Sequence, residues 1–95
     1  MRQTRAIAIH PSTRQAVRIH AAATGQTIRG ALAALLEALA SQENPPVPHI
    51  RTPDRRRRTF AVEADAAAWA RLDALRRDQN RTWNDLTHAA LGGAE

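Results

Sequence analysis

The sequence predicts a small, mainly helical fold built from two copies of one strand–helix–helix unit, 55 residues apart in the chain. Residues 5–40 and residues 60–91 each begin with a short alternating apolar run, continue as a helical pattern, break at a turn residue and resume as a second helix. Under this shift Val17 aligns with Leu72. Because neither copy is large enough to bury a core alone, we expect one half to complete the other.

The boundaries of the repeats follow from this alignment. Residues 1–40 form the first repeat, residues 41–56 form a linker rich in proline and arginine, and residues 57–95 form the second repeat. The two repeats together are expected to make one compact domain.

Composition narrows the classes of function. The chain of 95 residues has no cysteine, which excludes a disulfide framework and a thiolate metal site. It has no apolar run of the ~18–20 residues that a membrane span needs and no signal-peptide pattern, so we expect a soluble, cytoplasmic protein without a membrane partner. No constellation of side chains supports catalysis, and we expect neither an enzyme nor a cofactor.

The positive charge is unevenly distributed. The net charge is +5, and all 14 basic residues are arginines. Residues 45–58 carry five arginines against one acid, whereas residues 59–95 carry four arginines against six acids. Positive charge therefore concentrates before and between the repeats, which favours a polyanionic partner.

The first repeat begins with a predicted half-buried strand over residues 5–10. Ile7 and Ile9 alternate onto the inward face. The outward face carries Thr4, Ala6, Ala8 and His10. Pro11 suits the first turn of a helix, where its missing N–H has no cost, and Ser12 or Thr13 is expected to cap that helix.

Two helices follow in the first repeat. The first is expected to run to Ala23, and its inward positions are predicted to be Ala16, Val17, Ile19 and Ala23. Gly25 is free to take the left-handed conformation that ends a helix, and Thr27 is expected to cap the next one. The apolar stripe of that second helix is Ala31, Leu32, Leu35, Leu36 and Leu39.

The linker contains four of the five prolines, between Ser41 and Asp54, and is predicted to hold no packed element. Its length is sufficient to carry the second strand across the domain to the first.

The second repeat follows the same pattern with different residues. Its strand is expected to place Phe60, Val62 and Ala64 inward and Thr59, Ala61 and Glu63 outward. Asp65 is a good helix cap, Asn80 tolerates the left-handed turn, and Thr82 caps the last helix with Asp85 in the position of a capping box. Core positions of the helix between these caps are Trp69, Leu72 and Leu75, and Gly92 with Gly93 ends the last helix. Asp73, Asp78 and Asp85 interleave with arginines, which predicts a solvated, salt-bridged face.

A strand followed by two helices with a Gly-x-Thr or Asn-x-Thr corner resembles the ribbon-helix-helix family of DNA-binding proteins. The residues that carry the resemblance in the first copy are Ile7, Ile9, Val17, Gly25, Thr27 and Leu32. In the second copy they are Val62, Leu72, Asp73, Leu75, Asn80, Thr82 and Leu86. The resemblance implies an antiparallel two-stranded ribbon in the major groove of DNA. Because one chain looks like both protomers, it implies a tandem, single-chain pseudo-dimer similar to plasmid conjugation accessory proteins.

The resemblance also implies an interface with double-stranded DNA. The residues expected to face the bases are Thr4, Ala6, Ala8, Arg57, Thr59, Ala61 and Glu63. The residues expected at phosphates are Arg2, Arg5, Thr27, Arg55, Arg56, Arg58 and Thr82. The run of arginines over 55–58 also fits an ordinary solvated linker, and the two threonines also fit ordinary helix capping. Many family members carry longer base-reading side chains than alanine, and the two strands differ, so an asymmetric DNA site is expected.

Several alternatives remain open at this stage. A transcriptional repressor and an accessory protein of plasmid maintenance or transfer fit equally well, and an antitoxin that binds a toxin as well as DNA is the alternative class, with the proline-rich segment as its docking site. Ile28 and Trp83 follow the caps in both copies and either pack locally or form a patch for self-association along DNA. The four histidines are scattered, and no metal site or catalytic role is expected of them.

Overall fold

The computed structural model describes residues 1–51 and 57–93. Its element order is β1 (Arg2–Ile9), α1 (Pro11–Thr24), α2 (Ile28–Ala40), β2 (Arg58–Asp65), α3 (Ala66–Gln79) and α4 (Trp83–Gly93). The chain is therefore mainly helical, with each strand followed by two helices, as the sequence predicts. The first strand is longer than expected, since pairing with β2 extends it back to Arg2.

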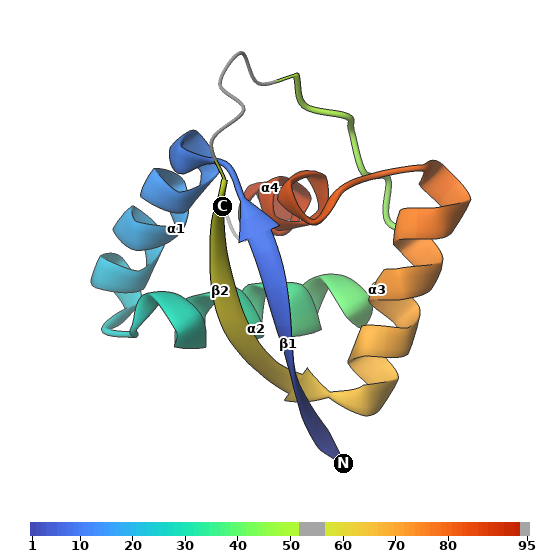
Figure 1. Cartoon of the computed structure of the whole chain (residues 1–95), viewed down its shortest axis with the longest axis horizontal. Helices are drawn as coiled ribbons and strands as arrows, with labels where there is room; N and C mark the ends of the chain where they lie inside the picture. Colours follow the sequence, from blue (N-terminus) through green and yellow to red (C-terminus); the bar gives the residue numbers. More distant parts are fainter. Residues whose placement is uncertain (52–56, 94–95) are drawn as a thin grey trace.

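The two strands form an antiparallel ribbon within one chain, in which Ala6 lies opposite Ala61. Side chains alternate across this ribbon as expected for the period of two. Ile7, Ile9 and Val62 are buried on its inner face. The outer face carries the small residues of both strands and looks away from the helices (Figure 1).

The helices pack so that each strand–helix–helix unit completes the other. α2 contacts β2, and α4 contacts β1, so the second helix of each unit lies under the strand of the other unit. α2 and α4 also contact each other in the centre, while α1 and α3 lie on opposite sides of the ribbon (Figure 1). Helix α3 also packs against its own strand, β2.

Helix α1 differs from the sequence prediction at its start and on its buried face. His10 is its N-cap and is buried, because the residue before Pro11 stays extended and turns the ring inward to accept a hydrogen bond from the Ser12 N–H. Placing His10 on the outer face, and choosing Ser12 or Thr13 as the cap, was therefore wrong. The buried residues of α1 are Thr13, Val17 and Ala21, so the inward assignment of Ile19 and Ala23 was also wrong.

The physical reason for the second error is the position of α2 and α4, the two helices on which α1 packs. The Thr13–Val17–Ala21 face of α1 is narrow and polar at one end, and it packs on α2 and α4, which leaves Ile19 62% exposed. Thr13 and Ala21 are small enough for this close contact with α2 and α4, whereas Ile19 lies on another face of α1.

Four other helix ends form as the sequence predicts. Gly25 takes a φ of 69° after α1, and Asn80 takes a φ of 53° after α3. The Thr27 hydroxyl accepts a hydrogen bond from the Gly30 N–H at 3.1 Å, and Asp65 accepts one from the Ala67 N–H at 3.0 Å. The expected leucine stripe of α2 is buried in the core.

Residues 41–51 connect the units without a helix or strand, as the sequence predicts, but part of this linker packs against the domain. Val47 is buried and is held between α3 and α4: its N–H donates to Gln79 Oε1 at 2.9 Å, and its carbonyl accepts from Arg81 Nε at 2.6 Å. Gln79 Nε2 also donates to the Pro45 carbonyl at 2.9 Å. We call residues 45–51 the strap, because they lie over the corner between α3 and α4.

Candidate nucleic-acid interface

The residues expected to face DNA bases come together on the outer face of the ribbon. Thr4 lies opposite Glu63, Ala6 opposite Ala61, and Ala8 opposite Thr59. Ala8 is half-buried and the other five are exposed. The inward and outward assignments of β2 were therefore correct, and the centre of the outer face is formed by methyl and hydroxyl groups that allow close approach of a partner.

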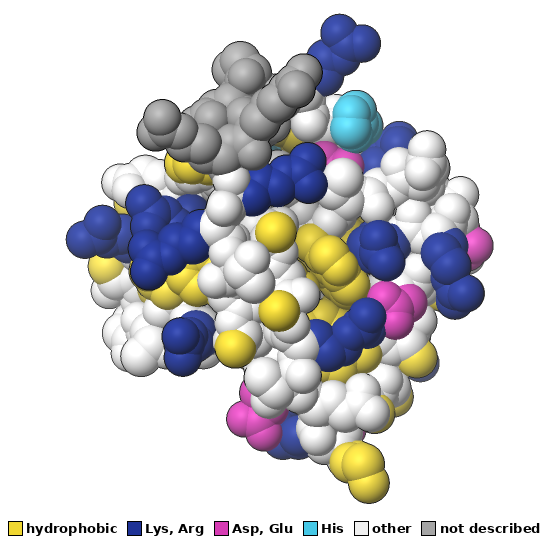
Figure 2. Space-filling view, viewed as in Figure 1, with side chains coloured by type: hydrophobic (Ala, Val, Ile, Leu, Met, Phe, Trp, Pro, Cys, Tyr) yellow, Lys and Arg dark blue, Asp and Glu magenta, His cyan; other side chains and the backbone are white. Residues whose placement is uncertain are grey.

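Basic side chains lie on both sides of this ribbon in the view that looks onto its outer face (Figure 2). Arg57 and Arg58 are exposed at the start of β2, and Arg58 lies over the Phe60 ring at 5.4 Å. Within residues 1–51 and 57–93 neither has an acidic partner. Arg55 and Arg56, also expected at phosphates, lie outside the described residues.

The opposite end of the ribbon is acidic. Arg2 is half-exposed and bridges two carboxylates, Glu37 at 3.3 Å and Glu63 at 3.4 Å. The N-terminal ammonium group lies 3.3 Å from Asp65. With its charge already balanced here, Arg2 is less available for a phosphate than the arginines at the start of β2.

The start of α2 borders the outer face of the ribbon. A hollow of about 360 Å³ is lined by Arg29 and Gly30 from this helix and by Thr4, Ala61 and Glu63 from the strands. Arg29 is exposed, and the first turn of α2 contains no acidic residue. No acid in the first turn offsets the partial positive charge of the helix N-terminus, which lies beside the predicted base-facing residues.

Arg29 was missed by the sequence analysis. A signal was present, because it stands two residues after the Thr27 cap and so in the first turn of the helix. The hydrophobic pattern of this helix predicts its buried leucines but gives no information about an exposed arginine.

The start of α4 is closed by a carboxylate. Asp85 accepts from the Thr82 N–H at 3.1 Å and from the Ile50 N–H of the strap at 2.9 Å, and it lies 3.1 Å from His49. In return the Asp85 N–H donates to the Thr82 hydroxyl at 3.2 Å, which completes the expected capping box. Asp85 is therefore buried, and its assignment to a solvated face was wrong.

These hydrogen bonds change the acidity of Asp85. Burial raises its pKa, but the hydrogen bonds from the Ile50 and Thr82 N–H groups, from His49 and from the Thr82 hydroxyl outweigh burial, so the pKa lies below the ordinary value of 3.8. Asp85 is thus charged at neutral pH, and the Thr82 N–H expected at a phosphate is already occupied.

A cluster of aromatic and charged side chains lies between β1 and α4. Trp69 is buried, donates from Nε1 to the Gln3 carbonyl at 2.9 Å and meets Trp83 edge to face at 5.5 Å. The Arg5 guanidinium lies 5.2 Å from the Trp69 ring and 5.7 Å from the Trp83 ring, and it pairs with Asp73 at 2.7 Å. Trp69 is thus a core residue, as predicted, and it also joins the two units.

Trp83 and Ile28 are both partly buried and pack against the core. This favours the local-packing interpretation of the two residues. Their use in self-association along DNA stays a prediction.

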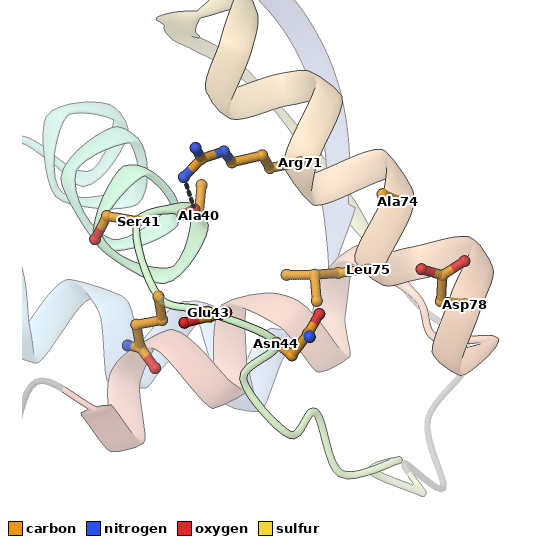
Figure 3. A pocket seen from close by; sticks show the side chains of 9 residues that line it. Ala40, Ser41, Glu43, Asn44, Arg71, Ala74, Leu75 and Asp78 are labelled. Carbon is orange, nitrogen blue, oxygen red and sulfur yellow. Dashed lines mark hydrogen bonds between the residues drawn. The ribbon is translucent and has the colours of Figure 1, made fainter.

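A hollow of about 500 Å³ lies away from the predicted DNA residues. It is formed by the end of α2, the turn after it and α3, with Leu75 and Asp78 on one side and Glu43 on the other (Figure 3). Arg71 closes one end by donating to the Ala40 carbonyl at 3.2 Å. Polar and apolar residues of both units line this hollow, which lies where α2 of the first unit meets α3 of the second.

The described part of the chain offers neither a metal site nor a membrane span. No group of three or more His, Asp or Glu side chains there is placed to hold a metal ion. Among the same residues, no helix has the length and apolar character needed to cross a membrane.

Comparison with known proteins gave no match: no protein-family model, no curated protein and no solved structure shows significant similarity to this chain.

Proposed function

We propose that the chain is a tandem ribbon-helix-helix protein, a single-chain pseudo-dimer that binds duplex DNA with sequence preference by placing the β1–β2 ribbon in the major groove. The observation that carries the proposal is the intramolecular antiparallel ribbon whose exposed outer face is bordered by arginines. A two-stranded ribbon matches the ~12 Å width of the major groove. No pairing with a second chain is needed to form this ribbon.

The composition of the outer face supports a particular kind of recognition. Ala6 and Ala61 suit apolar contact with thymine methyl groups, the two threonines can donate or accept, and Glu63 can accept from cytosine N4. Because small side chains provide few strong contacts, arginines at phosphates are expected to supply much of the affinity. The use of such binding in repression, or in plasmid maintenance or transfer, fits the same chemistry.

An antitoxin function gains no support from the proline-rich segment. The strap, which is the part of that segment described by the structure, packs against α3 and α4 of its own chain. We therefore do not extend the proposal to a toxin partner.

The proposal is tested by fluorescence anisotropy of a labelled duplex taken from upstream of the gene, compared with a scrambled duplex of equal length over a series of salt concentrations. We expect tighter binding to the natural duplex that persists at physiological salt. Sedimentation should give a monomer of 10.4 kDa in dilute solution, because the ribbon is complete within one chain. Absence of binding to either duplex, or an obligate dimer, would contradict the proposal.

A further inference from the structure

The two ends of the proposed DNA interface differ at the start of the second helix of each unit. Under the 55-residue shift, the position of Gly30 in α2 is occupied by Asp85 in α4. The Asp85 carboxylate, charged and bound to the Thr82 N–H, cancels the positive field of the α4 N-terminus. A phosphate placed there would meet a negative charge, so the second unit needs another way to hold DNA.

Two arginine side chains, rather than free backbone N–H groups, supply positive charge beside the start of α4. The Arg76 guanidinium is 5.0 Å from the Trp83 ring, and Arg5 faces the same ring at 5.7 Å. Trp83 is the first residue of α4, so both guanidinium groups lie next to the helix end that Asp85 closes. In the first unit the positions of Arg76 and Trp83 are occupied by Ala21 and Ile28. The stacking of an arginine on a tryptophan therefore occurs at this position in the second unit and not in the first.

The cluster keeps an unbalanced positive charge. Its one acid, Asp73, lies 2.7 Å from Arg5 but 4.0 Å from Arg76, at the limit of an ion pair. Two arginines therefore share one carboxylate. The Arg76 side chain is 36% exposed, and its Nε has no hydrogen-bond partner among the described residues.

The cluster also lies beside the ribbon. Arg5 belongs to β1 itself, and α4 packs against β1. The view onto the outer face of the ribbon shows basic, acidic and hydrophobic side chains gathered on the side of α3 and α4 (Figure 2). A DNA backbone that follows a ribbon in the groove passes along such a flank.

We propose that Arg76, held against Trp83 and assisted by Arg5, binds a DNA phosphate on the flank of the second unit, whereas the first unit uses the open start of α2 with Arg29. The inference rests on the proposed DNA-binding function. Stacking against an indole orients the planar guanidinium before DNA arrives and leaves its terminal N–H groups free for two phosphate oxygens. Asp73 competes with the phosphate for the two arginines and so limits the affinity.

The test compares Arg76→Gln with Arg77→Gln in the full chain. Both arginines lie in the last turn of α3, so both variants lose the same charge near the helix end, but only Arg76 lies over Trp83. Anisotropy of a labelled duplex is measured over a salt series for each protein. We expect Arg76→Gln to bind several-fold more weakly and with a log–log salt slope shallower by about 0.9, and Arg77→Gln to keep the slope of the wild type.

Asp73→Asn gives a second readout that misfolding cannot imitate. Removing the competing carboxylate frees both arginines, so this variant should bind the duplex more tightly than the wild type. The chain has only two tryptophans, Trp69 and Trp83, so its emission reports on this cluster, and we expect it to change with the same isotherm as the anisotropy.

The outcomes separate this inference from the proposed function. If the wild type binds duplex DNA but Arg76→Gln and Arg77→Gln have equal slopes and Asp73→Asn gains no affinity, the phosphate site is overturned and DNA binding stands. If the wild type binds no duplex at all, both are overturned.

Discussion

The two strand–helix–helix units have the same order of elements. They differ in the side chains that anchor their outer helices and in whether the start of the second helix is accessible. The first unit leaves the start of α2 without an acid, and its outer helix α1 buries Thr13, Val17 and Ala21. The second unit has its outer helix anchored by Trp69, and the start of α4 is closed by Asp85 and covered by the strap. The difference teaches that two similar units joined in one chain can carry different residues at equivalent positions. Each residue of the chain occupies only one position in the fold, so it need not fit both units.

In a symmetric dimer every residue must serve both flanks of the ribbon. Here the corner of the second unit is stabilised by contacts with the strap, and the same contacts in the first unit would occupy the proposed phosphate position at the start of α2. The equivalent corner of the first unit, around Gly25 and Thr27, is exposed. We infer that stability and partner contact are divided between the units.

The largest expected effect contrasts the two outer helices. Trp69→Ala should lower the free energy of unfolding by about 3–5 kcal/mol, since it removes a buried indole, its hydrogen bond to Gln3 and its contact with Trp83. Arg14→Ala, at the equivalent place in α1, should change it by less than about 1 kcal/mol, because that side chain is half-exposed. Urea unfolding measures both values. Equal losses of stability in the two variants would mean that these positions of α1 and α3 contribute equally to the free energy of unfolding, which would contradict the difference between the two units.

The next effect concerns the closed start of α4 and depends on pH. Asp85→Asn should destabilise the protein by about 1–3 kcal/mol at neutral pH, because an amide cannot accept all of the hydrogen bonds that the carboxylate accepts. In the wild type the pKa of Asp85 is lowered by folding, so its contribution is complete above about pH 4 and is lost as the pH falls through the lowered pKa.

Urea unfolding of the wild type and Asp85→Asn at neutral and acidic pH checks this prediction. The stability difference between the two proteins should shrink as the solution becomes acidic. Asp65, whose pKa is also lowered by its hydrogen bond with Ala67, is present in both proteins and so cancels. A constant difference across the pH range would show that the charge of Asp85 is not what stabilises the corner.

The smallest effect is expected from copying the acid of α4 into α2. Gly30→Asp should weaken binding to duplex DNA several-fold and make the salt slope shallower by about 0.9, because a carboxylate would close the open helix start. Gly30→Asn is the matched control: in both variants the new Cβ lies 3.1 Å from the Thr27 hydroxyl, but only Asp adds charge. If both variants bind alike in a salt series of anisotropy measurements, the start of α2 does not contact phosphate.

Much of the fold was accessible from the sequence. The strand faces, the left-handed turns at Gly25 and Asn80 and the cap at Thr27 were predicted correctly because each depends on residues close in the chain. The capping box of α4 is local in the same sense, since Thr82 and Asp85 are three residues apart.

The errors have a different origin. Ile19 and His10 were misplaced because the burial of α1 is decided by its packing on both α2 and α4. His10 donates its N–H to Asn84 of α4, which lies more than half the chain away in sequence. The strap was missed because its hydrogen bonds to Gln79 and Arg81 follow no period. Likewise the pairing of Arg5 with Asp73, a partner 68 residues distant, follows no local pattern.

The sequence by itself determined the repeat, the elements and the faces of the ribbon, since periodicity and helix caps act over a few residues. Only the tertiary structure decided which helix start is open and which arginine lies on Trp83. It did so because side-chain pairing and electrostatic fields depend on distance in space, and residues from both units meet at each end of the ribbon.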